Sequence, residues 1–180
     1  MNSTKFSLIP ATVATVPPIE VIGVVKRDLE WLHIQYQLTG KLSEIKMASP
    51  NSKPNRKYDL WETTCCEFFV RPYDQSQYWE FNLAPSGDWN IFRFPDYRQD
   101  IAEELAYNAL KFEVWRSPEL FQLDLAVDLS PIIHPQQNLD LAISAVIESR
   151  KQLSYWALTH PATEADFHHQ ESFAIALTSG

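Results

Sequence analysis

Strict alternation of apolar and polar residues in two segments of the C-terminal half is the strongest constraint on the fold. In residues 119–129, every second residue is apolar, and residues 139–148 repeat this pattern. Successive side chains of a strand point to opposite faces, so the alternation predicts strands with one buried and one exposed face. Such half-buried strands are typical of antiparallel sheets.

Shorter versions of this pattern recur along the chain. Together with the two long segments they predict an all-β fold: an antiparallel β-sandwich of about ten strands with jelly-roll-like or immunoglobulin-like topology. At most one or two short helices are expected, one of them after Asp100, which has Glu103 in the capping-box position. A length of 180 residues favours a single domain over 1–180. The other strand candidates are residues 20–25, 31–38, 60–70, 77–84, 88–94, 110–116, 153–160 and 172–177.

The connection between two of these strands has informative turn chemistry. Pro85 suits the first turn position and Gly87 suits a left-handed position, which favours a three-residue loop pairing Ala84 with Asp88. A two-residue Ser86-Gly87 turn would shift the pairing by one residue. We favour the first register because it gathers the large apolar side chains on one face: Trp79, Phe81, Leu83, Trp89 and Ile91.

Charge and cysteine content narrow the function classes. A formal net charge of −8 argues against binding to nucleic-acid phosphates or to anionic membranes. The N-terminal segment has no apolar block of a signal peptide, and no apolar run approaches the ~20 residues of a membrane span, so we expect a cytoplasmic protein. Cys65 and Cys66 are adjacent, and strand geometry predicts free thiols on opposite faces. A paired-sulfur redox or metal motif is the alternative.

Aromatic residues make up 13% of the chain, and many of them occur beside polar residues between positions 61 and 93. Saccharide sites combine flat aromatic faces with carboxylates, amides or guanidinium groups that bind hydroxyls. In the favoured register Trp89 shares the core face, which leaves Trp61, Tyr78 or Phe92 as the aromatic wall. Alternatively, the acids of this segment face solvent or pair with Arg71 or Arg93. The candidate ligand-binding residues are Trp61, Glu67, Tyr78, Glu80, Asn82, Trp89 and Arg93.

A second group of polar residues lies near the C-terminus and consists of His160, Asp166, His168 and His169. These side chains suit zinc or another divalent metal, or a hydrogen-bonded clamp that orders the final loop. No nucleophile elbow, phosphate-binding loop or dinucleotide fingerprint is present, and the chain has only four glycines. Glu67 and Glu80 could serve as a glycosidase acid and base, but we expect no catalysis.

Two segments resemble a known family. The first is LWETTCCEFFVRP followed by YWEFNLAPSGDWNIF, and the second comprises SAVIES, SYWALTHP and DFHH. They are similar to DOMON-like domains related to family-nine carbohydrate-binding modules. The resemblance implies a non-catalytic, ligand-binding sandwich whose small-molecule ligand is a sugar or haem, and we favour a saccharide. Haem or metal binding, or a protein-interaction role, are the alternatives.

Overall fold

The computed structural model describes residues 3–12, 16–150 and 152–179, and strands are the main regular secondary structure of this part of the chain. The described residues contain no α-helix, and their only helical segments are 3₁₀ turns of three residues. No helix among them is long and apolar enough to span a membrane. The all-β prediction is confirmed. The strands are β1 (Ser3–Pro10), β2 (Ile19–Asp28), β3 (Trp31–Gly40), β4 (Cys65–Pro72), β5 (Tyr78–Leu83), β6 (Trp89–Phe94), β7 (Ala102–Glu103), β8 (Phe112–Arg116), β9 (Leu120–Asp128), β10 (Leu139–Ser149), β11 (Gln152–Ala157) and β12 (Ile175–Leu177).

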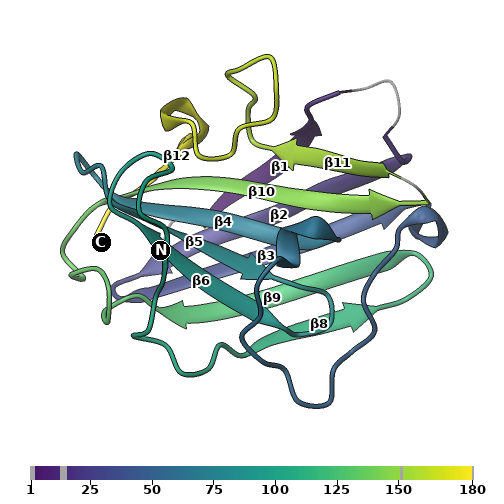
Figure 1. Cartoon of the computed structure of the whole chain (residues 1–180), viewed down its shortest axis with the longest axis horizontal. Coiled ribbons are helices and arrows are strands. Elements are labelled where there is room, and N and C mark those ends of the chain that lie inside the picture. Colours follow the sequence, from purple (N-terminus) through teal and green to yellow (C-terminus); the bar gives the residue numbers. More distant parts are fainter. Residues whose placement is uncertain (1–2, 13–15, 151, 180) are drawn as a thin grey trace.

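All strand pairs are antiparallel, and they form one curled sheet in the order β7-β6-β5-β4-β10-β11-β1-β2-β3-β9-β8, with β12 beside β10. Strand β1 joins the two halves, because its first part pairs with β2 and its end, Ile9 and Pro10, pairs with β11. We call β1, β2, β3, β9 and β8 the β2 limb, and β7, β6, β5, β4, β10 and β11 the β4 limb. Figure 1 shows the strands of one limb crossing over those of the other.

The inner faces of both limbs share one apolar core. Phe68 and Phe81 of the β4 limb stack with ring centroids 4.5 Å apart, and they belong to the same buried cluster as Tyr36 of β3. The Tyr36 hydroxyl donates a buried 2.7 Å hydrogen bond to the Glu67 carbonyl, which ties the limbs together. The apolar side chains of the alternating strands β9 and β3 therefore face the opposite limb.

The hairpin between β5 and β6 has the three-residue loop that its sequence predicts. The Ala84 amide donates to the Asp88 carbonyl at 2.9 Å, and Gly87 has a φ of +93°, which favours glycine. The five large apolar residues from Trp79 to Ile91 accordingly lie in the shared core. Cys65 and Cys66 are buried free thiols on opposite faces, as predicted, with only Cys66 in the shared core.

Several boundaries differ from the sequence-based expectation, and the described residues form twelve strands rather than about ten. The helix predicted after Asp100 is wrong: Ala102–Glu103 pair with β6 instead, and Asp100 has a left-handed φ of +46°. The predicted strand 60–70 begins as the 3₁₀ turn Leu60–Glu62 and becomes strand only at Cys65. Strand β1 was missed because its inward residues, Phe6 and Leu8, are too few for a clear pattern.

Strands β4 and β5 are buried on both faces, with every residue of β5 buried. Their outer face carries a second apolar cluster of Phe69, Tyr78, Phe92, Phe94 and Ala142. Loop residues Phe167 and Phe173 pack on this cluster from above. A sheet covered by loops in this way can hold polar side chains in a partly closed space, and this happens around Glu67 and Glu80.

Candidate functional site

A cleft of about 810 Å³ lies on the outer face of the β4 limb. Its floor comes from neighbouring strands, with Glu67 on β4, Glu80 on β5, Val146 on β10 and Tyr155 on β11. Three chain segments form its walls: the 3₁₀ turn with Trp61, the loop after β6, and the loop before β12. The lining residues are Trp61, Glu62, Glu67, Glu80, Phe94, Arg98, Ile101, Val146, Leu153, Tyr155, Ala165, Phe167 and His168.

Two buried carboxyl groups share the floor. Glu67 pairs across the strands with Asn82, and Phe69 pairs with Glu80, so the two acids are diagonal neighbours on one face. Glu67 is 2% exposed and Glu80 is 6% exposed. Glu80 Oε1 accepts a 2.8 Å hydrogen bond from Asn82, whereas Glu67 Oε2 has only a 3.5 Å contact with the Ser144 hydroxyl. Glu67 Oε1 has no hydrogen-bond partner among the described residues.

Burial raises the pKa of both acids, since each ionised form loses its hydration. It raises the pKa of Glu67 well above its ordinary value, and the neighbouring charge of Glu80 adds to this effect. Burial also raises the pKa of Glu80 to about 7, against the hydrogen bond from Asn82 and the charge of Arg98. The pair therefore retains bound protons near neutral pH.

His168 stands beside Glu80 as a neutral side chain. The Arg98 backbone amide donates to the Tyr78 hydroxyl at 3.2 Å, and the same hydroxyl lies 2.8 Å from His168 Nδ1. His168 Nε2 lies 3.7 Å from Glu80 Oε2. Burial and the charge of Arg98 together lower the pKa of His168 to about 4, against the opposing charge of Asp166.

An ion pair closes one side of the cleft. Arg98 Nη2 lies 2.8 Å from Asp166 Oδ1, and the Tyr97 hydroxyl donates to Asp166 Oδ2 at 2.5 Å. The His168 backbone amide donates to the same carboxylate at 3.1 Å. These bonds lower the pKa of Asp166 although burial opposes its ionisation. They join the loop after β6 to the loop before β12, and Asp166 balances the charge of Arg98.

Aromatic rings stand on both sides of the carboxyl pair. Trp61 packs edge-on against Phe92, with ring centroids 5.6 Å apart. On the other side Tyr155 packs edge-on against Phe167 at 6.1 Å, and both line the cleft. The arrangement offers apolar ring surface and hydrogen-bond acceptors in one space.

The structure separates the seven predicted binding residues into three groups. Trp61, Glu67 and Glu80 line the cleft, while Tyr78 and Asn82 lie behind it and bond to His168 and Glu80. Trp89 does not join them, because it is 3% exposed in the shared core on the opposite sheet face. Arg93 also lies on that opposite face, since it pairs with Trp79.

The alternative placement of the acids, exposed or paired with arginine, is wrong. Both acids are buried, and Arg71 pairs instead with Asp140 at 3.1 Å. Sequence analysis also missed Arg98, Tyr155 and Phe167 as cleft residues. The sequence signals near them are the SYWALTHP and DFHH stretches of the family resemblance, which contain Tyr155 and Phe167.

The late polar residues make separate contacts. His160 Nε2 lies 2.8 Å from the Ile9 carbonyl, and His169 Nδ1 accepts from the Glu171 amide at 3.2 Å. Asp166 bonds to Arg98 and Tyr97, and His168 to Tyr78, as above. Within the described ranges, no three histidine, cysteine or acidic side chains are grouped closely enough to hold a metal ion.

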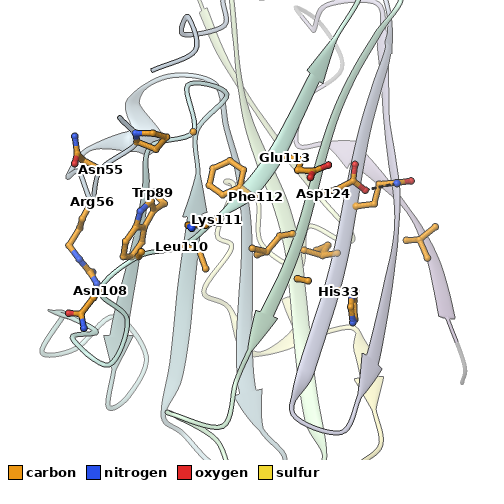
Figure 2. A pocket seen from close by; sticks show the side chains of 18 of the residues that line it. His33, Asn55, Arg56, Trp89, Asn108, Leu110, Lys111, Phe112, Glu113 and Asp124 are labelled. Carbon is orange, nitrogen blue, oxygen red and sulfur yellow. Dashed lines mark hydrogen bonds between the residues drawn. The ribbon is translucent and has the colours of Figure 1, made fainter. Parts of the chain in front are cut away.

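A larger hollow of about 1110 Å³ borders β8 on the β2 limb (Figure 2). Two of its charged side chains, Arg56 and Asp124, already have partners within the chain. The Arg56 guanidinium lies 4.4 Å from the Trp89 ring centroid and donates to the carbonyls of Glu104 and Tyr107. The Asp124 carboxylate accepts 2.6 Å bonds from the side-chain amides of Gln35 and Gln122. We therefore place the candidate site in the cleft with the unpartnered carboxylate oxygen.

Comparisons with known proteins show what the fold is similar to. No protein-family model matches the chain, and no curated protein matches it in sequence. A solved structure of a proposed carbohydrate-binding protein from Bacteroides uniformis has a TM-score of 0.75 at 13% identity, covering 97% of this chain and 85% of that one. A family-nine carbohydrate-binding module from Caldicellulosiruptor kristjanssonii, solved with glucose, has a TM-score of 0.54 at 9% identity, covering 92% and 78%. The chain thus shares its fold with these two structures.

Proposed function

We propose that this domain binds a saccharide without catalysis, in the cleft on the outer face of the β4 limb. The observation that carries the proposal is the buried Glu67 Oε1, which has no hydrogen-bond partner in the described part of the chain. A buried carboxylate oxygen without a partner is costly to the fold. A ligand hydroxyl would supply that partner.

The cleft walls complement a sugar ring. The apolar C–H face of a pyranose packs on aromatic rings, and Trp61, Tyr155 and Phe167 present such rings around the acids. The carboxyl groups of Glu67 and Glu80 accept hydrogen bonds from ring hydroxyls. The likeness in fold to carbohydrate-binding modules supports the same function.

The position of the acids favours binding over hydrolysis. Glycosidases place two carboxyl groups on either side of the scissile bond. Glu67 and Glu80 instead project from neighbouring strands of one sheet face. They stand side by side beneath a ligand rather than across it. A hydrolysis assay on the same sample and sugars should give no product.

Binding can be tested by calorimetry against a panel of neutral monosaccharides and short oligosaccharides. Trp61→Ala and Glu67→Ala should each weaken binding by about tenfold or more, because each removes a wall or an acceptor. Trp115→Ala is the matched control, since Trp115 is 55% exposed on β8 and away from the cleft. Absence of binding to every sugar, or equal weakening by Trp115→Ala, would contradict the proposal.

We also propose a specific sandwich topology and a family relation for this chain. The shared core between the limbs supports a sandwich of jelly-roll-like or immunoglobulin-like topology. The likeness to a family-nine module supports the proposed relation to DOMON-like domains.

A further inference from the structure

The acids of the cleft have no free counter-charge beside them. Three of its lining residues are acids: Glu62, Glu67 and Glu80. Arg98 is the one basic side chain among the described lining residues other than His168, and Asp166 already balances it at 2.8 Å. His168 is neutral. A buried charge without a counter-charge must be protonated or find a cation.

We propose that the preferred ligand of this cleft is a sugar bearing a protonated amino group, rather than a neutral or an acidic sugar. This inference rests on the proposed function, and it specifies the chemical class of the ligand. The observations that carry it are the diagonal carboxyl pair on the floor, the unpartnered Glu67 Oε1, and the commitment of Arg98 to Asp166.

An ammonium group fits the hydrogen-bonding capacity of the floor. It carries three N–H donors and no acceptor, and the pair offers Glu67 Oε1 together with Glu80 Oε2, which has only the 3.7 Å contact with His168. Charge-assisted bonds of this kind are about twice as strong as neutral ones. Aromatic rings attract cations through their faces, so Trp61 and Tyr155 reinforce the preference. Anionic sugars would be repelled by the same groups.

Proton balance gives the inference a second observable. The carboxyl pair holds a proton near neutral pH, and an incoming ammonium replaces it as the counter-charge. The proton then leaves to solvent, while the ammonium keeps its own three protons. The other ionisable groups facing the pair are Glu62, Cys65, Arg98 with Asp166, His168, Tyr78 and Tyr155. A neutral sugar leaves the proton in place.

The test compares four sugars of the same ring shape by calorimetry near neutral pH: glucosamine, glucose, N-acetylglucosamine and glucuronate. Glucosamine should bind about tenfold more tightly than glucose or N-acetylglucosamine, and glucuronate should bind most weakly. Repeating the titration in two buffers of different ionisation enthalpy should show proton release with glucosamine but not with glucose.

Variants assign the preference to the acids. Glu67→Gln and Glu80→Gln keep the shape of the side chain but remove its charge, so the affinity ratio of glucosamine to glucose should fall to about two or less. Glu113 is exposed on β8 and lies outside the cleft, so Glu113→Gln should leave the affinity ratio of glucosamine to glucose unchanged. This variant controls for general attraction of cations by the net charge of −8.

The outcomes separate the two proposals. Equal wild-type affinity for glucose and glucosamine would overturn the amino-sugar inference and leave saccharide binding intact. A preference that survives in both glutamine variants would overturn it too, because the amine would be recognised elsewhere. Failure of all sugars to bind would overturn the proposed function and the inference together.

Discussion

Replacing Glu80 with glutamine should stabilise the protein in a manner that depends on pH. The pKa of Glu80 rises from its ordinary 4.5 to about 7 in the folded chain because burial disfavours its charge. The folded state therefore binds more protons than the unfolded state between these values. The contribution of Glu80 to the free energy of unfolding is fully present below its pKa of 4.5 in the unfolded chain. It is lost as pH rises through its pKa of about 7 in the folded chain. Glutamine cannot ionise, so the variant escapes this loss.

The magnitude follows from the difference in pKa. At ~1.36 kcal/mol for each pH unit, ionising Glu80 in the fold costs on the order of 3 kcal/mol above about pH 8. Near pH 4 the wild-type side chain is protonated, and glutamine replaces it with little change. Its oxygen still accepts the hydrogen bond from Asn82, which is 2.8 Å long in the wild type. The difference in unfolding free energy should thus grow from near zero to a few kcal/mol.

Urea unfolding followed by tryptophan fluorescence, repeated across this pH range, measures the difference directly. Glu20→Gln provides the control, since Glu20 is exposed on β2 and its loss leaves the cleft unchanged. A difference between Glu80→Gln and wild type that stays constant with pH would refute the reasoning. So would a variant that is less stable than wild type at pH 8.

Three further predictions concern the core, a loop and the thiols. Gly23→Ala should destabilise the protein by about 1–3 kcal/mol in thermal unfolding, because an added Cβ would lie 2.0 Å from the Gln35 carbonyl and 2.3 Å from the Phe6 ring; an unchanged melting temperature would contradict this. Asp88→Ala should speed hydrogen exchange in residues 51–57, since the Asp88 carboxylate accepts bonds from Asn51, Asn55 and Lys57. Although burial opposes its ionisation, these bonds lower the pKa of Asp88 to about 2, so the wild-type loop should stay protected until pH falls to that range. Cys65 and Cys66 should resist thiol reagents in the native protein and react in urea, because both are buried and burial raises the pKa of each thiol; labelling of the native protein at the unfolded rate would argue against the fold.

Local chemistry in the sequence determined the strands and one register. The alternation in β9 and β3 follows from side chains pointing to opposite faces, and it holds wherever one face meets the core and the other meets water. The loop of Pro85, Ser86 and Gly87 set the pairing of β5 with β6, because its conformational preferences act within a few residues. From that register alone, Trp89 could be placed in the core rather than in the site.

Only the tertiary structure decided where the cleft lies. Strands β4 and β5 are buried on both faces, so their pattern does not distinguish a core face from a face covered by loops. Glu67 and Glu80 are buried because residues 165–168 and the loop after β6 close over them, joined by the Arg98–Asp166 ion pair. Tyr155 and Phe167 meet these acids through contacts between distant parts of the chain. Because such contacts depend on how the sheet curls and on what covers it, no local pattern of residues encodes them.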